Sequence, residues 1–238
     1  MAAVRAEDRF GNPRWVVADQ VAQAARRRYA SDVLAIGVHG SLAHGDDTDG
    51  SDVDLVVVSY RPGGGPRPTT RRVDGVLVGL GVIGAEEYLR HARTLSTSWP
   101  LAADQYLTTR AIYDPHAWFE LLRDTHLGRL AEARDHEFSA LAREAWCRAA
   151  SAHAKATRLA EWYETDAALL VLAEARLAGA TVAGLLSRTY FRNSADAVRR
   201  TGFAGADVGE VGAVLRAQAD DLATRGRPVD GTVGALFA

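Results

Sequence analysis

Two short segments constrain this chain more than any others: Gly40-Ser41 and, eleven positions after the serine, Asp52-Val53-Asp54. Residues 33–38 are apolar and rich in β-branched side chains, which predicts a buried strand that ends at the Gly-Ser pair. A Gly-Ser turn lets backbone N–H groups approach a phosphate closely. Alternation in the second segment puts both carboxylates on one strand face. Two carboxylates this close to each other and to a phosphate-binding turn would repel each other. We therefore predict that Mg²⁺ lies between them, bound by Asp52, Asp54 and the phosphates of the substrate.

The pattern around these segments predicts a small mixed sheet with flanking helices. We expect strands over 33–38, 53–59, 76–83 and 106–113, and helices over 15–29 and 85–95. Residues 62–68 contain too many glycines and prolines for either element. Asp114-Pro115 is a typical cap and first turn of a further helix.

The remainder of the chain shows helical patterns and no convincing strand. Segments rich in alanine, leucine and arginine around 129–163, 166–190 and 207–224 predict a helical bundle. The predicted fold class is therefore α+β, with an α/β-type domain over residues 1–126 and an all-α bundle over residues 127–238.

Composition agrees with a cytoplasmic enzyme. Of 238 residues, 47% are hydrophobic, which is ample for a packed core, and the net charge of −2 provides no basic footprint for nucleic acid. We expect no membrane contact, because no uninterrupted apolar span of membrane length occurs. The single cysteine, Cys147, excludes an intrachain disulfide and is predicted to be a buried helix residue.

These motifs resemble the polymerase-β-like nucleotidyltransferase superfamily and, more narrowly, the kanamycin (aminoglycoside 4′-O-) nucleotidyltransferases. Beyond the two central segments, the likeness rests on residues 35–38, 48–50, 98–101, 105 and 112–114, and it is strong up to about Asp114. The resemblance implies transfer of a nucleoside monophosphate, AMP from ATP by default or from another nucleoside triphosphate, to a hydroxyl of a small-molecule acceptor. It also implies a Mg²⁺ cofactor and a homodimer.

Three kinds of nucleotide-binding residues follow from the resemblance. Gly40 and Ser41 form the phosphate-binding turn, and His44 stands where the family usually has arginine. Lys155 falls where the family has a triphosphate-contacting lysine on the first long helix of its helical domain. It is the only lysine among 28 Lys and Arg residues, which favours a role for a compact ammonium that a planar guanidinium does not fill.

The chain also departs from the family at acidic positions. Gly79 occupies the place of a glutamate near the metal, and Ser98 stands where an antibiotic-binding acid is expected. Ser151 occupies the position of the proposed general base, and a neutral serine does not accept a proton as a carboxylate does. Glu144 remains open as the base, whereas His153 is poorly placed on an ideal helix.

Three hypotheses follow. The first is an active nucleotidyltransferase whose acceptor is less cationic than kanamycin, such as a sugar or nucleoside compound. The second is an aminoglycoside-modifying enzyme in which Asp46, Asp47, Asp74 or Asp104 replaces the missing acids. The third is a catalytically silent relative that binds nucleotide or a partner protein, because the third carboxylate is missing.

Overall fold

The computed structural model describes residues 11–236, and they form two compact units. The first unit contains the chain up to Thr94 and Gln105–Ala131, and the second contains Leu95–Asp104 and the chain from Glu132 onward. The expected division between residues 126 and 127 lies inside a helix, α5, that spans Trp118–Glu132.

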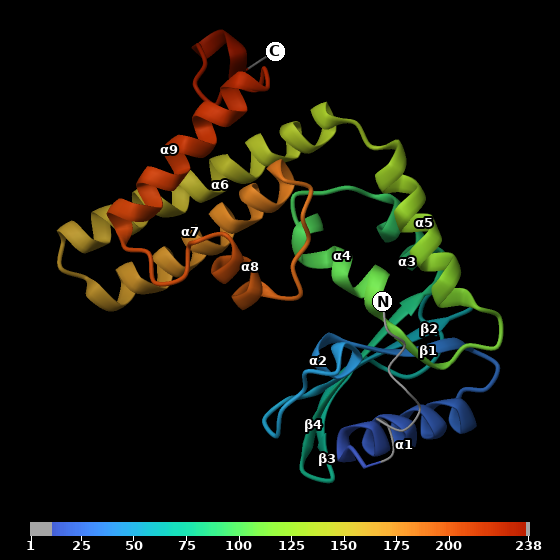
Figure 1. Cartoon of the computed structure of the whole chain (residues 1–238). Helices are drawn as coiled ribbons and strands as arrows, with labels where there is room; N and C mark the ends of the chain where they lie inside the picture. The colour runs from blue at the N-terminus through green and yellow to red at the C-terminus, as the bar shows by residue number, and fades with distance from the viewer. Residues whose placement is uncertain (1–10, 237–238) are drawn as a thin grey trace. The chain divides into compact units, whose positions relative to one another are not determined.

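The first unit contains a mixed sheet of five strands within the described residues, with the order β3-β4-β2-β1-β5 (Figure 1). Strands β2 and β4 are parallel, and the other neighbouring pairs are antiparallel. The strand bounds are β1 Val33–His39, β2 Val53–Ser59, β3 Thr69–Val73, β4 Val76–Gly84 and β5 Arg110–Tyr113. The predicted α+β class is confirmed.

Helix α1, Pro13–Arg28, covers one face of this sheet. Asn12 caps it by accepting a hydrogen bond from the Arg14 amide at 2.9 Å, and Pro13 follows at a position where its missing N–H costs nothing. Apolar residues of α1 pack against alternate residues of the central strands, including Val53 and Leu55. Burial of this face fixes the strand register, because a slip of one residue would turn Asp54 into the core.

The opposite face is covered farther along the strands by helices of the same unit. An added Cβ at Gly37 would overlap the Phe119 ring of α5, so this helix packs closely on β1. The Asp114 carboxylate accepts hydrogen bonds from the Trp118 and Phe119 amides at 2.7 and 2.9 Å and so caps α5. The helix begins at Trp118, so the prediction that Pro115 lies in its first turn is wrong. Helix α3, Ala85–Arg93, follows β4.

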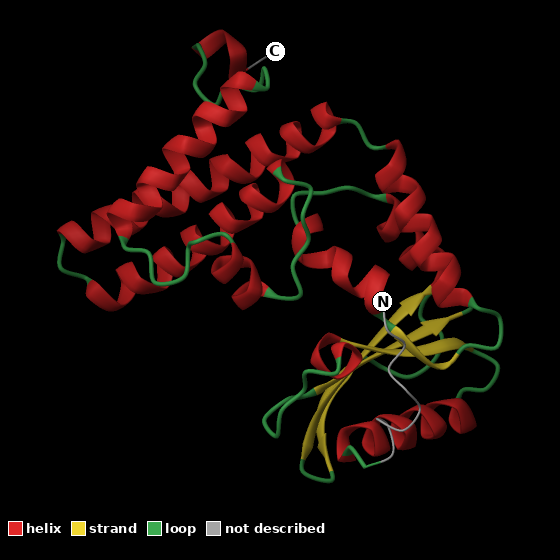
Figure 2. Cartoon of the chain, viewed as in Figure 1, coloured by secondary structure: helices red, strands yellow, loops and turns green. Residues whose placement is uncertain are grey.

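The second unit is helical, as expected from the sequence (Figure 2). Its core contains many alanines together with Phe191 and Phe203, which are almost fully buried. Its main helices are α6 Asp135–Glu161, α7 Thr165–Leu186, α8 Ser194–Arg200 and α9 Val208–Thr224. The prediction for Cys147 is wrong: the side chain is exposed, because α6 turns the neighbouring Trp146 toward α9, where its indole donates to the Leu215 carbonyl.

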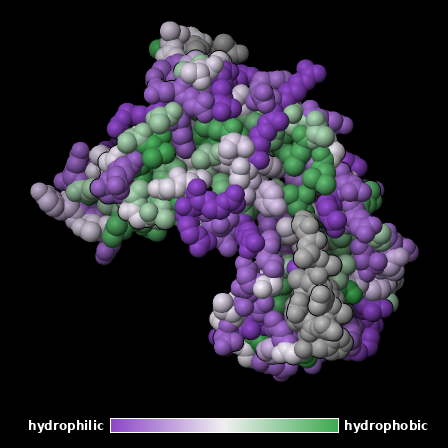
Figure 3. All heavy atoms as spheres, viewed as in Figure 1, coloured by the Kyte–Doolittle hydropathy of each residue, from purple (hydrophilic) through white to green (hydrophobic). Residues whose placement is uncertain are grey.

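Helix α7 is the one helix in the described part of the chain that is long and apolar enough to span a membrane. Half of its apolar window is buried inside the protein, where it packs against α6 and α9. The core helix of a soluble bundle has the same length and composition, so this is weak evidence for a membrane span. Figure 3 shows hydrophobic residues at the surface of this helical region.

The structure also contains elements that the sequence patterns did not indicate. No strand is predicted over residues 69–73, because the sequence Thr-Thr-Arg-Arg-Val is mostly polar. In the structure these residues form β3, which lies at the sheet edge and is almost wholly exposed. The strand expected over 106–113 begins only at Arg110, because residues 99–108 form helix α4. The short helix α8 also lay in a segment with no prediction.

Candidate active site

Asp54 and Asp52 lie at the start of β2 on the sheet face that α1 does not cover. Asp52 is exposed and directly precedes the strand, while Asp54 is its second residue and is half-buried. Val53, Leu55 and Val57 point into the core on the other side. The predicted alternation is present from Val53 to Val57, whereas Asp52, which was expected on the same strand face as Asp54, precedes the strand.

Gly40 and Ser41 begin α2, a short helix over Gly40–His44 that directly follows β1. Gly40 has a φ of 73°, a conformation that favours glycine, and Gly45 ends the helix with a φ of 75°. The Ser41 carbonyl accepts the Gly45 amide at 2.9 Å, which closes the turn. His44 is the last residue of α2 and is partly exposed.

A row of residues crosses four strands at the level of Asp54. His39 is the antiparallel partner of Asp54 on β1, Gly79 is its parallel partner on β4, and Thr70 is the partner of Gly79 on β3. Residues paired in this way share one sheet face. The row confirms by position that Gly79 is the residue adjacent to the candidate metal ligand. The nearest acid on this hairpin, Asp74, lies in the turn five residues earlier, about 17 Å along the strand.

The Asp54 carboxylate lies between two glycines. A Cβ built at Gly40 would be 3.0 Å from Oδ2 of Asp54, and a Cβ built at Gly79 would be 3.0 Å from Oδ1. Such separations are tighter than almost all real Cβ contacts, so a side chain at either place would displace the carboxylate or its neighbour. The two glycines therefore leave the room that the Asp54 carboxylate occupies.

Burial raises the pKa of Asp54 above its ordinary value, and the charge of Asp52 raises it further. His39 acts in the opposite direction and lowers that pKa. His39 is the last residue of β1. The proximity of His39 to Asp54 could have been predicted from the two strands, because antiparallel pairing of the segments that flank the 40–52 loop brings residue 39 opposite residue 54.

The charge of Asp52 disfavours the ionised form of Asp54, and a divalent cation bound to both carboxylates would offset that effect. No group of three His, Cys, Asp or Glu side chains suitable for a metal occurs in the part of the chain that the structure describes. Asp52 and Asp54 still fit Mg²⁺, which is commonly held by one or two carboxylates together with substrate phosphates and water. The protein would thus contribute only part of the coordination sphere.

The loop that leads into Asp52 is tied to the first turn of α1. Nη1 of Arg14 lies 3.7 Å from Oδ2 of Asp47, and Nη2 lies 3.8 Å from Oδ1 of Asp49. Nε of Arg14 donates to the Ser51 carbonyl at 3.1 Å. The Asn12 side-chain amide donates to Asp47 at 2.8 Å. The Asp47 carboxylate is therefore almost buried and already paired, so it is not accessible to an acceptor.

The predicted residues of the helical half lie in the second unit, on α6. Lys155 and Ser151 are both exposed there, one turn apart. Glu144 is also exposed and forms an ion pair with Arg148 at 3.8 Å. His153 is engaged elsewhere, because its Nε2 lies 2.8 Å from the Val208 carbonyl. The prediction that His153 is a poor substitute for the base agrees with this contact.

A pocket of about 270 Å³ lies within the second unit, between residues 97–101 and helices α6 and α7. It contains Ser98, at the position of an expected acid, together with Arg148 and Glu174. Its floor is mainly apolar, from Leu101, Ala145, Leu177 and Ala178. One carboxylate and one guanidinium leave the pocket with no net charge, which suits a neutral or zwitterionic molecule better than a polycation.

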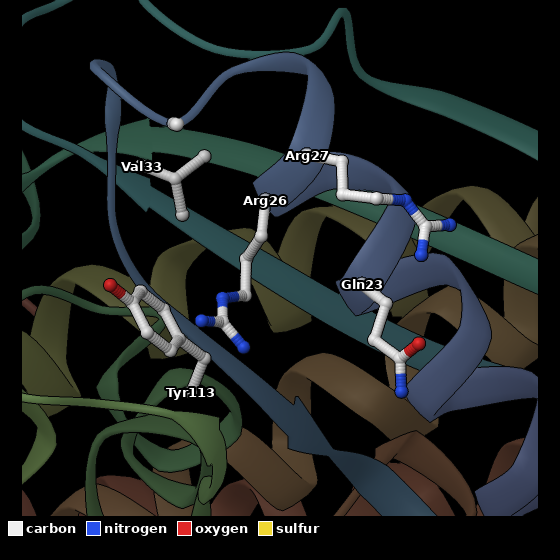
Figure 4. A pocket seen from close by; sticks show the side chains of 6 residues that line it. Gln23, Arg26, Arg27, Val33 and Tyr113 are labelled. Atoms are coloured by element: carbon white, nitrogen blue, oxygen red, sulfur yellow. The ribbon is translucent and has the colours of Figure 1, made fainter.

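Another pocket, of about 290 Å³, belongs to the first unit (Figure 4). It lies near Val33, the first residue of β1, about 20 Å along the strand from Gly40. The Arg26 guanidinium carbon lies 3.9 Å from the centre of the Tyr113 ring, as expected of a cation–π contact. Its place at the opposite end of β1 separates this pocket from Asp52 and Asp54.

Comparison with known proteins gives a family match and likenesses to solved structures. Residues 18–96, about a third of the chain, match the family model described as a nucleotidyltransferase domain. No curated protein sequence matches the chain. A solved structure described as a nucleotidyltransferase-like protein from Exiguobacterium sibiricum 255-15 is similar over 87% of this chain and 75% of that chain, with 13% identity and a TM-score of 0.46. The matched span contains Gly40, Asp52, Asp54 and Gly79, and it supports a nucleotidyl transfer function in general.

Proposed function

We propose that this protein is a Mg²⁺-dependent nucleotidyltransferase that transfers a nucleoside monophosphate to a hydroxyl of a small acceptor. The observation that carries the proposal is the Asp54 carboxylate beside Asp52, between Gly40 and Gly79, within the span that matches a nucleotidyltransferase domain. ATP is the default donor because the resembling family uses it. An acceptor that is less cationic than an aminoglycoside fits the remaining residues best.

In the proposed reaction, the acceptor oxygen forms a bond to the α-phosphorus while the bond to the pyrophosphate oxygen breaks. The hydroxyl proton leaves to a general base, which in the resembling family is a glutamate at the position that Ser151 occupies here. A divalent cation bound by Asp52 and Asp54 would neutralise charge on the phosphate oxygens. Gly40 and Ser41 bring backbone amides to the same end of the sheet, and we propose that they and His44 bind the phosphates, together with Lys155.

Few of the candidate acidic side chains are accessible to bind a cationic acceptor, which bears on the charge of the acceptor. Of the four acids considered as replacements, Asp47 is paired with Arg14 and Asp104 is only 4% exposed. Asp74 lies in the β3–β4 turn, and Asp46 is exposed in the loop before Asp52. Amino sugars with several ammonium groups need several accessible carboxylates for charge-assisted hydrogen bonds. These observations favour a sugar, nucleoside or other hydroxyl compound with little positive charge over kanamycin.

The test is pyrophosphate release from Mg·ATP across a panel of neutral, zwitterionic and polycationic hydroxyl compounds. Asp52→Asn should abolish release, and Asp74→Asn is the matched control, because Asp74 is exposed and asparagine tolerates its positive φ of 49°. Release that requires one acceptor and Asp52 supports the proposal. Release with aminoglycosides alone would instead favour the antibiotic-modifying hypothesis.

A silent nucleotide-binding relative is the second candidate, and Gly79 is the observation that favours it. The third acidic position beside Asp54 has no side chain, and two-metal phosphoryl transfer commonly uses more than two acidic ligands. Tight Mg·ATP binding without pyrophosphate release for any acceptor would support this candidate.

We also propose that the protein is a cytoplasmic homodimer, as the resembling family implies. Exposed apolar side chains gather at the turn between α6 and α7, namely Trp162, Tyr163, Leu169 and Leu170. Clusters of this kind are typical of contact surfaces. Light scattering of the purified protein should give twice the chain mass of 25.5 kDa, and Leu170→Glu should reduce it to a single chain.

A further inference from the structure

We propose that Arg14, on the first turn of α1, is a positioning residue that holds the 46–51 loop so that Asp52 stays beside Asp54. The affinity of the site for a magnesium–nucleotide complex would then depend on an arginine that lies outside the motifs that carry the proposed chemistry. This inference rests on the proposed function for its effect on nucleotide binding, whereas its effect on the loop stands independently.

Arg14 is unusual because it is a buried charge with its partners in a single loop. Its residue exposure is 7%, although arginine is ordinarily an exposed residue. Three different nitrogens of the guanidinium meet Asp47, Asp49 and the Ser51 carbonyl. The planar fork of arginine is suited to several simultaneous contacts, and the single head of lysine is not.

The last of these contacts connects the arginine to the candidate catalytic carboxylate. Ser51 is the residue before Asp52, so the hydrogen bond from Nε of Arg14 fixes the peptide group that joins them. Within the loop, the Thr48 amide donates to Oγ of Ser51, and the Ser51 amide donates to the Thr48 carbonyl, both at 2.9 Å. The loop is thus a closed turn held on α1.

This anchor is needed because Asp52 has no strand partner of its own. Asp54 is held by β2 between β1 and β4, whereas Asp52 precedes the strand and is exposed. The charge repulsion between the two carboxylates favours a larger separation. A buried arginine that neutralises Asp47 and restrains the neighbouring Ser51 opposes that movement without occupying the metal-binding side of Asp52.

The experiment uses two variants and one control in the full chain. Arg14→Lys keeps the charge but loses the fork, and the double variant Arg14→Gln with Asp47→Asn removes both buried charges, so that neither is left unpaired. Arg27→Ala is the control, because Arg27 is an exposed arginine on the same helix. The measurements are amide hydrogen exchange over residues 46–52, ATP affinity with and without Mg²⁺, and the thermal midpoint.

In both Arg14 variants we expect exchange over residues 46–52 to become at least about tenfold faster. The Mg²⁺-dependent part of ATP affinity should fall about 10- to 100-fold, the usual effect of losing a residue that orients a metal ligand. ATP affinity without Mg²⁺ should not change, which a general loss of folding would not reproduce. The control should match the wild type in every measurement.

Three other outcomes would contradict different parts of the proposal. Wild-type exchange rates in both Arg14 variants would overturn the anchoring of the loop. Faster exchange with wild-type Mg²⁺ dependence would overturn the link from the loop to the site. If ATP affinity of the wild type shows no Mg²⁺ dependence, the proposed function fails, and hydrogen exchange alone still decides whether Arg14 holds the loop.

Discussion

Glycine serves two different purposes in the two units. In the sheet unit, Gly40 and Gly79 leave room for the two oxygens of Asp54, a charged and half-buried group. In the helical unit, Gly179 and Gly184 lie within α7 and leave room for buried aromatic rings. In both units an added Cβ would be too close to a neighbour, yet the neighbour is a carboxylate in one and a hydrocarbon surface in the other.

The two environments predict different effects when a glycine is replaced by alanine. A Cβ at Gly184 would lie 2.7 Å from the Phe191 ring and 2.8 Å from Cβ of Pro100, both of which are packed and have little room to shift. A Cβ at Gly79 would meet only an oxygen at the end of the Asp54 side chain. We therefore expect the helical glycines to affect stability and Gly79 to affect binding.

The largest expected effect is that of Asp54→Asn, which removes the charge that Gly40 and Gly79 accommodate. Nucleotidyl transfer should fall by at least about 1,000-fold, because a metal ligand contributes several kcal/mol to the reaction. Stability should stay constant or rise at neutral pH, since burial and Asp52 both disfavour the ionised Asp54. Transfer rates and thermal midpoints check both statements, and a large drop in the midpoint would contradict them.

Gly184→Ala should produce the next largest effect, on stability alone. Overpacking of this kind typically costs about 1–3 kcal/mol. Gly128→Ala is the matched control, because it also lies in a helix but would meet nothing within 4 Å, and it should stabilise by about 0.5–1 kcal/mol. Urea unfolding and Mg·ATP titration of both variants test this. A loss of nucleotide affinity in Gly184→Ala would break the comparison.

Gly79→Ala should weaken Mg·ATP binding by about tenfold, because displacing one metal-ligand oxygen resembles the loss of an orienting contact. Its thermal midpoint should remain close to that of the wild type. Gly79→Glu sharpens the test, since it restores the side-chain type expected from the family. Faster transfer in Gly79→Glu would show that the chain has lost a carboxylate, whereas slower transfer would show that the site is built around the glycine.

The smallest effect concerns pH and belongs to the sheet unit. His126 is fully buried, and burial lowers its pKa below the ordinary 6.5, although a 2.7 Å contact between Nδ1 and the Ala92 carbonyl opposes the shift. The unfolded chain therefore binds a proton more readily, so stability should fall as the pH drops below about 6.5. His126→Gln should flatten that dependence in urea unfolding between pH 7 and 5, and the exposed His136→Gln should not.

The sequence predicted the central strands because their patterns are strong. Residues 53–59 alternate around Asp54 and are then apolar up to the final Ser59, and β2 begins and ends where expected. Strand β3 was not predictable in the same way, because an edge strand with both faces exposed needs no apolar alternation. The Asp74-Gly75 turn joins β3 to its partner β4. Asp-Gly is a strong sequence signal for a hairpin and would have predicted this strand.

For the site, the sequence indicated which residues carry the proposed chemistry but not which residues hold them. Asp52, Asp54 and Gly40 were identified from spacing, and the position of Gly79 was confirmed by its register with Asp54. Arg14 was not singled out, because it is one of many arginines and its partners lie more than thirty residues away. Contacts between distant segments leave no local pattern, so only the folded structure revealed this anchor.

The path of the chain through the two units bears on how the protein is made. Strand β5 pairs with the central strand β1, yet it follows residues 95–104, which belong to the other unit. During synthesis, β1 would therefore keep an open edge until residues 110–113 leave the ribosome. Unpaired strand edges promote misassembly of partly made chains. A fragment that ends at residue 96 contains the whole family match but lacks β5 and α5, so we expect it to aggregate, whereas a chain released after residue 131 has every strand of the sheet in place.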